Sequence, residues 1–130
     1  MLLAKVRGRN TIGDSLVVCR LNTGGSSYGD LAELVNAATG WDTTGDEMQI
    51  IARRIVNLSR LFNIRHGLTA AMEYPSARYG SAPLDGVHLG KTITPVWKET
   101  LTRYYELMGW DRETGKPLSE TIASLGLPEN

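Results

Sequence analysis

Hydrophobic positions recur with helical spacing along most of the chain, and no segment shows the strict alternation of a half-buried strand. The clearest repeat runs from Thr44 to about Arg65 and predicts a helix roughly 30 Å long. Thr43 or Thr44 is its expected cap, and Gly67 its expected stop. Its apolar stripe consists of Met48, Ile51, Ile55, Leu58 and Phe62, widened by Ala52, Val56 and Leu61. On the opposite side, which we expect to be solvated, lie Arg53, Asn57 and Arg60.

Shorter amphipathic segments flank this long helix. One is expected to open at Gly29 or Asp30 and to end at Gly40, with a face formed by Leu31, Leu34, Val35 and Ala38. Another opens at Thr94-Pro95 and ends at Gly109, with a buried stripe of Trp97, Leu101, Tyr104 and Met108. A last short helix follows Pro117 and ends at Gly126.

The N-terminal segment is harder to assign. Residues 1–13 form a weak element, because Gly8, Asn10 and Gly13 interrupt it. Asp14 then stands where a helix N-cap is expected, ahead of the apolar positions Leu16, Val17, Val18 and Leu21. Since this run is β-branched, a short strand competes with a short helix. We favour the helix, because Asp14-Ser15 can cap it and the polar residues 22–27 can stop it.

Residues 68–93 contain prolines and glycines and no helical repeat, so they predict a long loop. Loops of this length are usually functional, or they wrap around another part of a larger protein. The predicted fold class is therefore all-α: a single helical domain over residues 1–130, with about five helices, one long central helix and this loop.

Composition narrows the classes of function. The 14 basic side chains balance the 14 acidic ones, which disfavours a nucleic-acid-binding domain or a membrane surface. The single cysteine, Cys19, excludes an internal disulfide, and no apolar run reaches the length of a membrane span. A reducing, cytoplasmic setting is expected. His66 and His88 lie far apart in sequence without ligand spacing, which disfavours a zinc site.

Several segments in register resemble one family. Asp14-x-x-Val17-Val18-Cys19 resembles a D-x-x-G-L-C motif, and residues 33–41 resemble E-L-x-N-A-x-T-G-W. Residues 54–67 resemble R-I-x-N-L-x-R-x-F-N-x-R-E-G, and residues 104–127 follow the last two helices of the same family in order. The chain is similar to the C-terminal part of the aldehyde:ferredoxin oxidoreductases, which carry a tungsten bis-pterin cofactor and one 4Fe-4S cluster.

The resemblance implies roles for four residues. Asp14 corresponds to a pterin-binding aspartate, and the backbone at Val17 and Val18 to a loop that packs on the same pterin. Cys19 corresponds to the fourth cluster ligand. These roles suit the chemistry, since a carboxylate accepts from pterin N–H groups and a thiolate is the usual ligand of cluster iron. Val17 departs from the family, which has glycine there, and valine adopts a positive φ only at a cost.

The resemblance also implies that much is missing. In the family the other three cluster cysteines, the β domain that binds pterin and the catalytic residues lie upstream, and none is in these 130 residues. One thiolate cannot ligate four irons. We therefore expect no bound cofactor and no activity in the isolated chain. Its partners would be the upstream domains or subunit of the same enzyme and ferredoxin, and a homo-oligomer is an open possibility.

Two functions follow from different classes. The first is the C-terminal helical domain of a tungsten or molybdenum pterin enzyme that oxidises aldehydes to carboxylic acids and passes electrons through the cluster to ferredoxin. The second is a cofactor-free helical interaction module that has lost the redox chemistry, for which Val17 in place of glycine is the main support. Substitution of Cys19 distinguishes the two.

Overall fold

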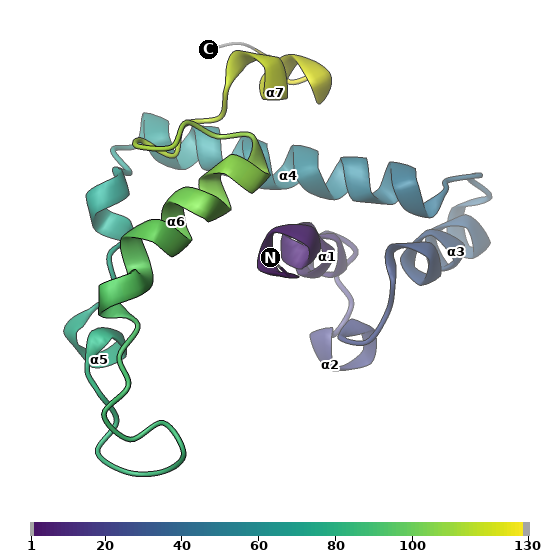
Figure 1. The fold of residues 1–130 in the computed structure, drawn as a ribbon. Helices are drawn as coiled ribbons and strands as arrows, with labels where there is room; N and C mark the ends of the chain where they lie inside the picture. Colours follow the sequence, from purple (N-terminus) through teal and green to yellow (C-terminus); the bar gives the residue numbers. More distant parts are fainter. Residues whose placement is uncertain (1, 129–130) are drawn as a thin grey trace.

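The structure, a computed structural model, describes residues 2–128 and confirms the all-α class (Figure 1). Within this range seven α-helices and one 3-10 helix replace the five helices expected, because short turns punctuate the connections. The elements are α1 Leu2–Ser15, α2 Arg20–Thr23, α3 Tyr28–Thr39, α4 Gly45–Arg65, η1 Ala70–Glu73, α5 Ala77–Gly80, α6 Thr94–Met108 and α7 Ser119–Ser124. For residues 16–21 the strand alternative is wrong, and the favoured helix opened by Asp14 is also wrong, since a turn at residues 16–17 and two residues outside any helix separate α1 from α2.

Helix α4 is the predicted long helix and organises the fold. Thr44 caps it: the hydroxyl accepts from the Glu47 N–H, and the Glu47 carboxylate accepts from the Thr44 N–H at 2.8 Å. The helix α3 begins one residue earlier than expected, because Ser27 and Asp30 form the same reciprocal capping box. Gly40, Gly67 and Gly109 follow helix ends with positive φ, as expected.

The weak element expected at residues 1–13 is instead the continuous helix α1. Gly8 explains the difference, since a Cβ built there would collide with the side chain of Ala52 and approach its Cα to 3.1 Å. The glycine costs helix propensity but lets the backbones of α1 and α4 touch where they cross. Figure 1 shows the crossing, with α1 seen nearly end-on and α4 lying across the view.

Two hydrophobic clusters lie along α4. The first joins the start of α4 to α1 and α3 and consists of Ile12, Leu31, Ala32, Val35, Met48 and Ala52. The second joins the middle of α4 to α6 and its C-terminal turn and consists of Val56, Tyr104, Tyr105, Met108 and Trp110. Helix α4 therefore contributes residues to both clusters of the core.

The apolar stripe of α4 is only partly correct. Leu58 and Phe62 are exposed, whereas Asn57 is fully buried and Arg60 is 6% exposed, so the expectation that both face solvent is wrong. Trp110 of the second cluster covers this side of the helix: its indole N–H donates to Asn57, and its ring lies against the Arg60 guanidinium. Arg53 is exposed, as expected.

The predicted loop is present with two short additions, η1 and α5, after which residues 81–93 are exposed throughout. Thr94 is the first residue of α6 rather than its cap, and its hydroxyl donates to the Gly80 carbonyl at 3.0 Å. Of the helices described here, none is both long and apolar enough to cross a membrane.

Candidate functional site

Residues 14–19, which comprise the end of α1 and the link to α2 and are called the connector below, hold all four residues singled out in the sequence. Helix α1 ends in a Schellman motif: the Val18 N–H donates to the Gly13 carbonyl at 3.1 Å and the Val17 N–H to the Asp14 carbonyl at 3.2 Å. This motif requires a left-handed residue, which here is Val17 with φ 58°. Among the described residues Val17 is the only non-glycine with positive φ.

Three other helices end with the same pair of bonds. After α4, α6 and α7 the left-handed position is taken by Gly67, Gly109 and Gly126. The valine therefore occupies a glycine position without changing the motif. A β-branched residue in this region of φ is strained by about 1–2 kcal/mol, which the surrounding hydrogen bonds must offset.

The structure corrects the roles expected of Asp14 in folding. Asp14 lies in the last turn of α1 rather than at the start of a helix, so it is not an N-cap. The next helix begins at Arg20, and Cys19 occupies its N-cap position with extended φ −65° and ψ 129°. Both Asp14 and Cys19 are exposed. The left-handed turn at Val17 thus separates a helix-borne carboxylate from a thiol on the following turn.

The connector carries uncovered apolar surface next to the thiol. The side chains of Val17 and Leu21 are 91% and 93% exposed, and Leu16 and Val18 are also exposed. Across the described residues 2–128, no group of three or more His, Cys, Asp or Glu side chains could hold a metal ion.

A second polar cluster, which the sequence did not reveal, lies in the interior around Arg60. Its guanidinium donates to both Glu73 oxygens, at 2.7 and 2.8 Å, and its Nε donates to the Gly115 carbonyl at 2.8 Å. The same group lies 4.6 Å from the Trp110 ring centroid and 5.4 Å from that of Tyr105. The Tyr105 hydroxyl donates to Glu73 as well. Arg60 thereby links α4, η1, α6 and the turn after it.

The electrostatics of this cluster favour the ion pair. Burial opposes the charge of Glu73, but the hydrogen bonds from Arg60 and Tyr105 and the charges of Arg60 and Arg7 lower its pKa below the ordinary value. Burial, together with the hydrogen bond to Glu73 and its charge, raises the pKa of Tyr105 to about 12. At neutral pH the tyrosine is a neutral donor and the glutamate an anion.

Asn57 completes the interior network. Its amide donates to the Arg53 carbonyl at 2.9 Å, and its Oδ1 accepts from the Trp110 indole at 2.8 Å. Trp110 is buried in the second core cluster, whereas Trp41 is exposed. The segments that carry the family resemblance contain Asn57, Arg60 and Tyr105. That resemblance, rather than periodicity, was the available signal for this cluster.

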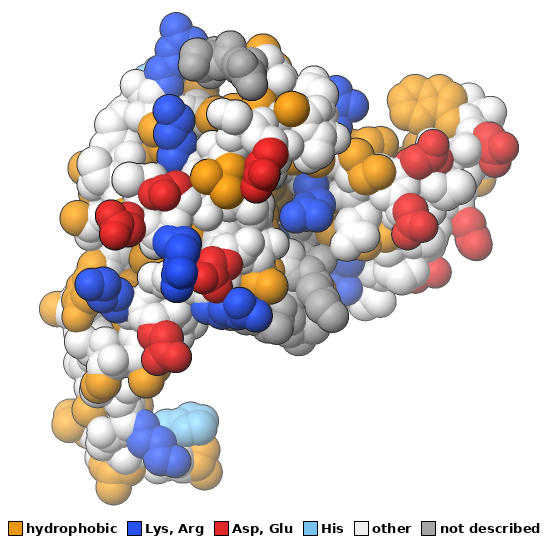
Figure 2. All heavy atoms as spheres, turned by 45° about the horizontal axis from the view of Figure 1, so that its top comes forward, with side chains coloured by type: hydrophobic (Ala, Val, Ile, Leu, Met, Phe, Trp, Pro, Cys, Tyr) orange, Lys and Arg blue, Asp and Glu red, His pale blue; other side chains and the backbone are white. Residues whose placement is uncertain are grey.

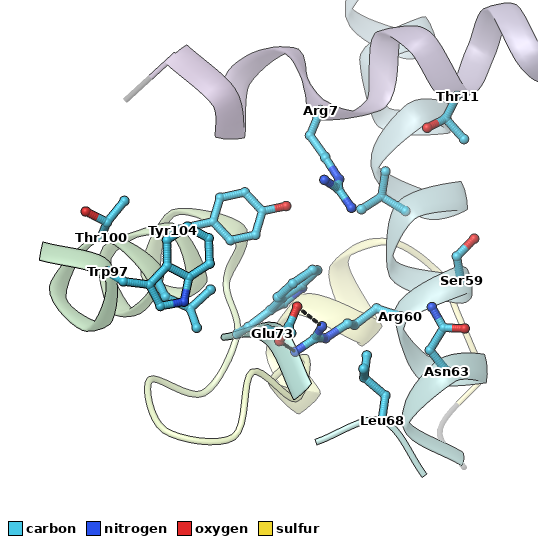
Figure 3. Close-up of a pocket in the computed structure, with 13 residues that line it drawn as sticks. Arg7, Thr11, Ser59, Arg60, Asn63, Leu68, Glu73, Trp97, Thr100 and Tyr104 are labelled. Atoms are coloured by element: carbon cyan, nitrogen blue, oxygen red, sulfur yellow. Dashed lines mark hydrogen bonds and ion pairs between the residues drawn. The ribbon is translucent and has the colours of Figure 1, made fainter. Parts of the chain in front are cut away.

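An open cleft of about 490 Å³ lies between α1, α4 and α6, with the Arg60–Glu73 pair on its wall (Figure 3). Arg7, Thr11, Ser59 and Asn63 line it on the side of α1 and α4, and Trp97, Thr100, Leu101 and Tyr104 on the side of α6. Two buried donors in it, the Trp97 Nε1 and the Tyr104 hydroxyl, find no hydrogen-bond partner in the described chain. A buried polar atom without a partner costs about 1–3 kcal/mol.

Comparison with known proteins agrees with the motifs. A family model described as aldehyde ferredoxin oxidoreductase, domains 2 and 3, matches residues 1–127. The chain belongs to this family. Over 118 residues it is 39% identical to the tungsten-containing aldehyde ferredoxin oxidoreductase of Pyrococcus furiosus and 36% identical to that of Thermococcus kodakarensis. Each match covers 89% of this chain and 19% of the relative, so the chain spans about a fifth of the length of these curated relatives.

The chain can be tested against the cofactors that its family implies. An exposed thiol on a turn fits one ligand position of an iron–sulfur cluster, since a cluster needs thiolates that it can reach. The left-handed turn at Val17 keeps the conformation for which glycine is preferred, so the substitution does not close the connector to a neighbouring group. The residues present thus fit one part of such a site.

Proposed function

We propose that this chain is the C-terminal helical domain of a tungsten- or molybdenum-containing aldehyde ferredoxin oxidoreductase and that its connector closes the cofactor site. In this proposal Cys19 is the fourth ligand of a 4Fe-4S cluster, Asp14 accepts hydrogen bonds from a pterin, and the backbone at Val17 and Val18 packs against the pterin. The bound groups would supply the oxidation of an aldehyde to a carboxylic acid and the path of electrons to ferredoxin.

The observation that carries the proposal is the geometry of the connector. A strained left-handed turn at Val17 holds an exposed carboxylate and an exposed thiol on either side of uncovered apolar side chains. Strain and exposed apolar surface both cost stability in the isolated chain, and both suit a surface that another part of the protein covers. Family membership supports the same conclusion, because the relatives are about five times longer than this chain.

The alternative is a helical interaction module without redox chemistry. Its main support was valine in place of glycine at position 17, and the positive φ of Val17 weakens that support. The same motif ends α4, α6 and α7, so the conformation at Val17 follows from helix termination and favours neither function, whereas membership of the family supports the redox proposal. The redox proposal is therefore favoured.

Iron and tungsten analysis of the complete protein from its native host tests the proposal. Wild type is expected to contain the pterin metal and about four irons, the number in one 4Fe-4S cluster. Each iron of the cluster needs its own thiolate ligand. Cys19→Ser should lose most of the iron and the absorbance of the cluster while keeping the helical circular dichroism. His88→Ala, in the exposed loop after α5, is the control and should keep both. Full iron content in Cys19→Ser would contradict the assignment.

A further inference from the structure

Helix α2, which begins directly after Cys19, has little apolar packing to hold it. It has four residues, and a helix this short is not stable by itself. Leu21 and Asn22 are exposed and Thr23 is half-buried, and none of them belongs to the two core clusters. The helix packs mainly against α1, on the side that faces away from α4 (Figure 1). Contacts with α1 therefore keep α2, and Cys19 with it, in place.

Arg9 of α1 makes a charged contact with the far end of α2. Its Nη2 donates to the Gly24 carbonyl, at the C-terminal end of α2, at 2.8 Å. A hydrogen bond from a charged donor is roughly twice as strong as a neutral one. The Nε of Arg9 is buried, so the side chain lies against the protein instead of extending into solvent. Its charge also acts on the hydroxyl of Tyr28, the first residue of α3.

Thr23 provides a second contact between α2 and α1. A Cβ on the buried residue Gly13 would lie 3.2 Å from the Thr23 hydroxyl, so Gly13 leaves the room that Thr23 occupies. The Thr23 N–H and hydroxyl donate to the Cys19 carbonyl at 3.2 and 3.3 Å, and the Asn22 N–H donates to it at 3.0 Å. The backbone of Cys19 is thereby joined through α2 to Thr23 and Gly24, the two residues that contact α1.

The chain around Cys19 is thus fixed on both sides. Before it, the Schellman motif at Val17 ties the chain to the end of α1, and after it Arg9 holds Gly24. We propose that Arg9 is a positioning residue: by holding α2 against α1, it keeps the Cys19 thiol in one place before a cofactor binds. The inference rests on the proposed function, in which Cys19 is a cluster ligand. A ligand that is already in place loses less freedom on binding, so it binds more tightly.

Relaxation of the backbone amides in the full 130-residue chain tests the contact without iron or tungsten. The order parameters of residues 19–24 should be about 0.85 in wild type and below about 0.6 in Arg9→Met, which removes the guanidinium and keeps the apolar stem. Those of α4 should be the same in both proteins. Arg7→Met is the matched control, since Arg7 is an exposed arginine of α1 that lies in the cleft beside α4 and α6, and it should behave as wild type.

Thr23→Val compares the two contacts. It removes the hydroxyl and keeps the shape of the side chain, so the packing over Gly13 stays. It should loosen residues 19–24 less than Arg9→Met, because a distance of 3.3 Å is long for a hydrogen bond between a hydroxyl and a carbonyl. A larger effect of Thr23→Val overturns the role of Arg9. Unchanged order parameters in Arg9→Met, or values below about 0.6 in wild type, also overturn it.

Iron release from the complete protein tests the consequence for the cofactor. In excess iron chelator, Arg9→Met should lose its iron about tenfold faster than wild type, because the loss of one charge-assisted hydrogen bond frees the ligand to move away. Arg7→Met should release iron as wild type does, and the helical circular dichroism of all three proteins should agree. Equal rates of release from Arg9→Met and wild type overturn the positioning role.

The two readouts separate this inference from the proposed function. Residues 19–24 that loosen only in Arg9→Met, together with a complete protein that holds no iron, would overturn the cofactor role of Cys19 and support the contact made by Arg9. A complete protein that holds its iron, together with order parameters that do not respond to Arg9→Met, would support the cofactor role and overturn the positioning role.

Discussion

Val17 shows that valine can be tolerated at a position whose left-handed backbone conformation favours glycine. The bonds around it are those that surround Gly67, Gly109 and Gly126, and only the residue type differs. The conformation is therefore set by the end of α1 and by the turn toward Cys19, and the valine bears the strain. The sequence alone suggested that this substitution could mark a lost function, and the positive φ of Val17 removes that reason.

Replacing Val17 with glycine should raise the free energy of unfolding by about 1 kcal/mol, or roughly 2–5 °C in Tm, because the left-handed strain disappears. Thermal unfolding followed by circular dichroism measures the effect. The reciprocal variant Gly126→Val places valine at φ 61° in open space and should lower Tm by a similar amount. A Val17→Gly variant that melts below wild type would show that the strain is absent.

Tyr105 should make stability depend on alkaline pH. Its pKa is about 12 in the folded chain and about 10 when unfolded, so its contribution is complete below pH 10 and is lost as pH rises toward 12. Denaturant unfolding should therefore show wild type losing its advantage over Tyr105→Phe between pH 10 and 12. Tyr79→Phe, at an exposed tyrosine, should follow wild type across the same range. Parallel curves for wild type and Tyr105→Phe would refute the hydrogen bond to Glu73.

Some features of the helices could be predicted from the sequence, and others could not. Caps and stops of α4 and the glycine ends of α3 and α6 follow from local hydrogen bonding, and local rules predict such features well. Helix α1 was missed because its glycines lower propensity locally, while the contact of Gly8 with Ala52 that stabilises it is tertiary. The burial of Asn57 and Arg60 was missed for the same reason, since their partners Trp110 and Glu73 lie distant in sequence.

The candidate site likewise has one part that the sequence motif predicts and one part that depends on tertiary contacts. The motif groups Asp14, Val17, Val18 and Cys19 within six residues, but the sequence predicted a helix capped by Asp14, whereas the structure has Asp14 in α1 and the other three residues between α1 and α2. The cleft at Arg7 and Tyr104 could not be predicted, because α1 and α6 lie far apart in sequence and come into contact only in the folded chain. Periodicity places Tyr104 on a buried face but says nothing of a hydroxyl that lacks a partner.

Two glycines of α1 should respond in opposite ways to alanine. Gly8→Ala should lower Tm, because its Cβ would collide with Ala52 and push α1 away from α4. Gly13→Ala meets only the Thr23 hydroxyl at 3.2 Å and a Val18 methyl at 3.9 Å, so the gain in helix propensity, up to about 1 kcal/mol, should raise Tm. Calorimetry of both variants measures the two changes in Tm. Equal changes would mean that the crossing of α1 and α4 tolerates a wider spacing.

The molecule as a whole leaves much apolar surface uncovered. Large side chains are exposed in the connector, on α4 and over residues 84–93, and Figure 2 shows hydrophobic side chains gathered at the tip formed by the loop after α5. A chain with zero formal net charge has little repulsion to keep copies apart. Such exposed apolar surfaces are typical of a domain that other domains cover in a larger protein.

We therefore expect the isolated chain to self-associate, with a sedimentation coefficient that rises with protein concentration and falls when exposed side chains are made polar. The double variant Leu84→Ser/Val87→Ser should sediment more slowly than wild type at high concentration, while Lys91→Ser, in the same loop, should not change it. A monomer at all concentrations would argue that these side chains are covered in some other way.

The exposed loop after α5 has one more consequence. Before it lie α1 to α5, and after it lie α6 and α7. The interior hydrogen bonds that join the two parts run from Arg60 to the Gly115 carbonyl, from Tyr105 to Glu73 and from Trp110 to Asn57. A single peptide-bond cleavage within residues 84–90 breaks none of them. Two separately expressed fragments should then reassemble into a nicked complex with the native fold, and the loop is a natural place to insert a tag or a reporter domain.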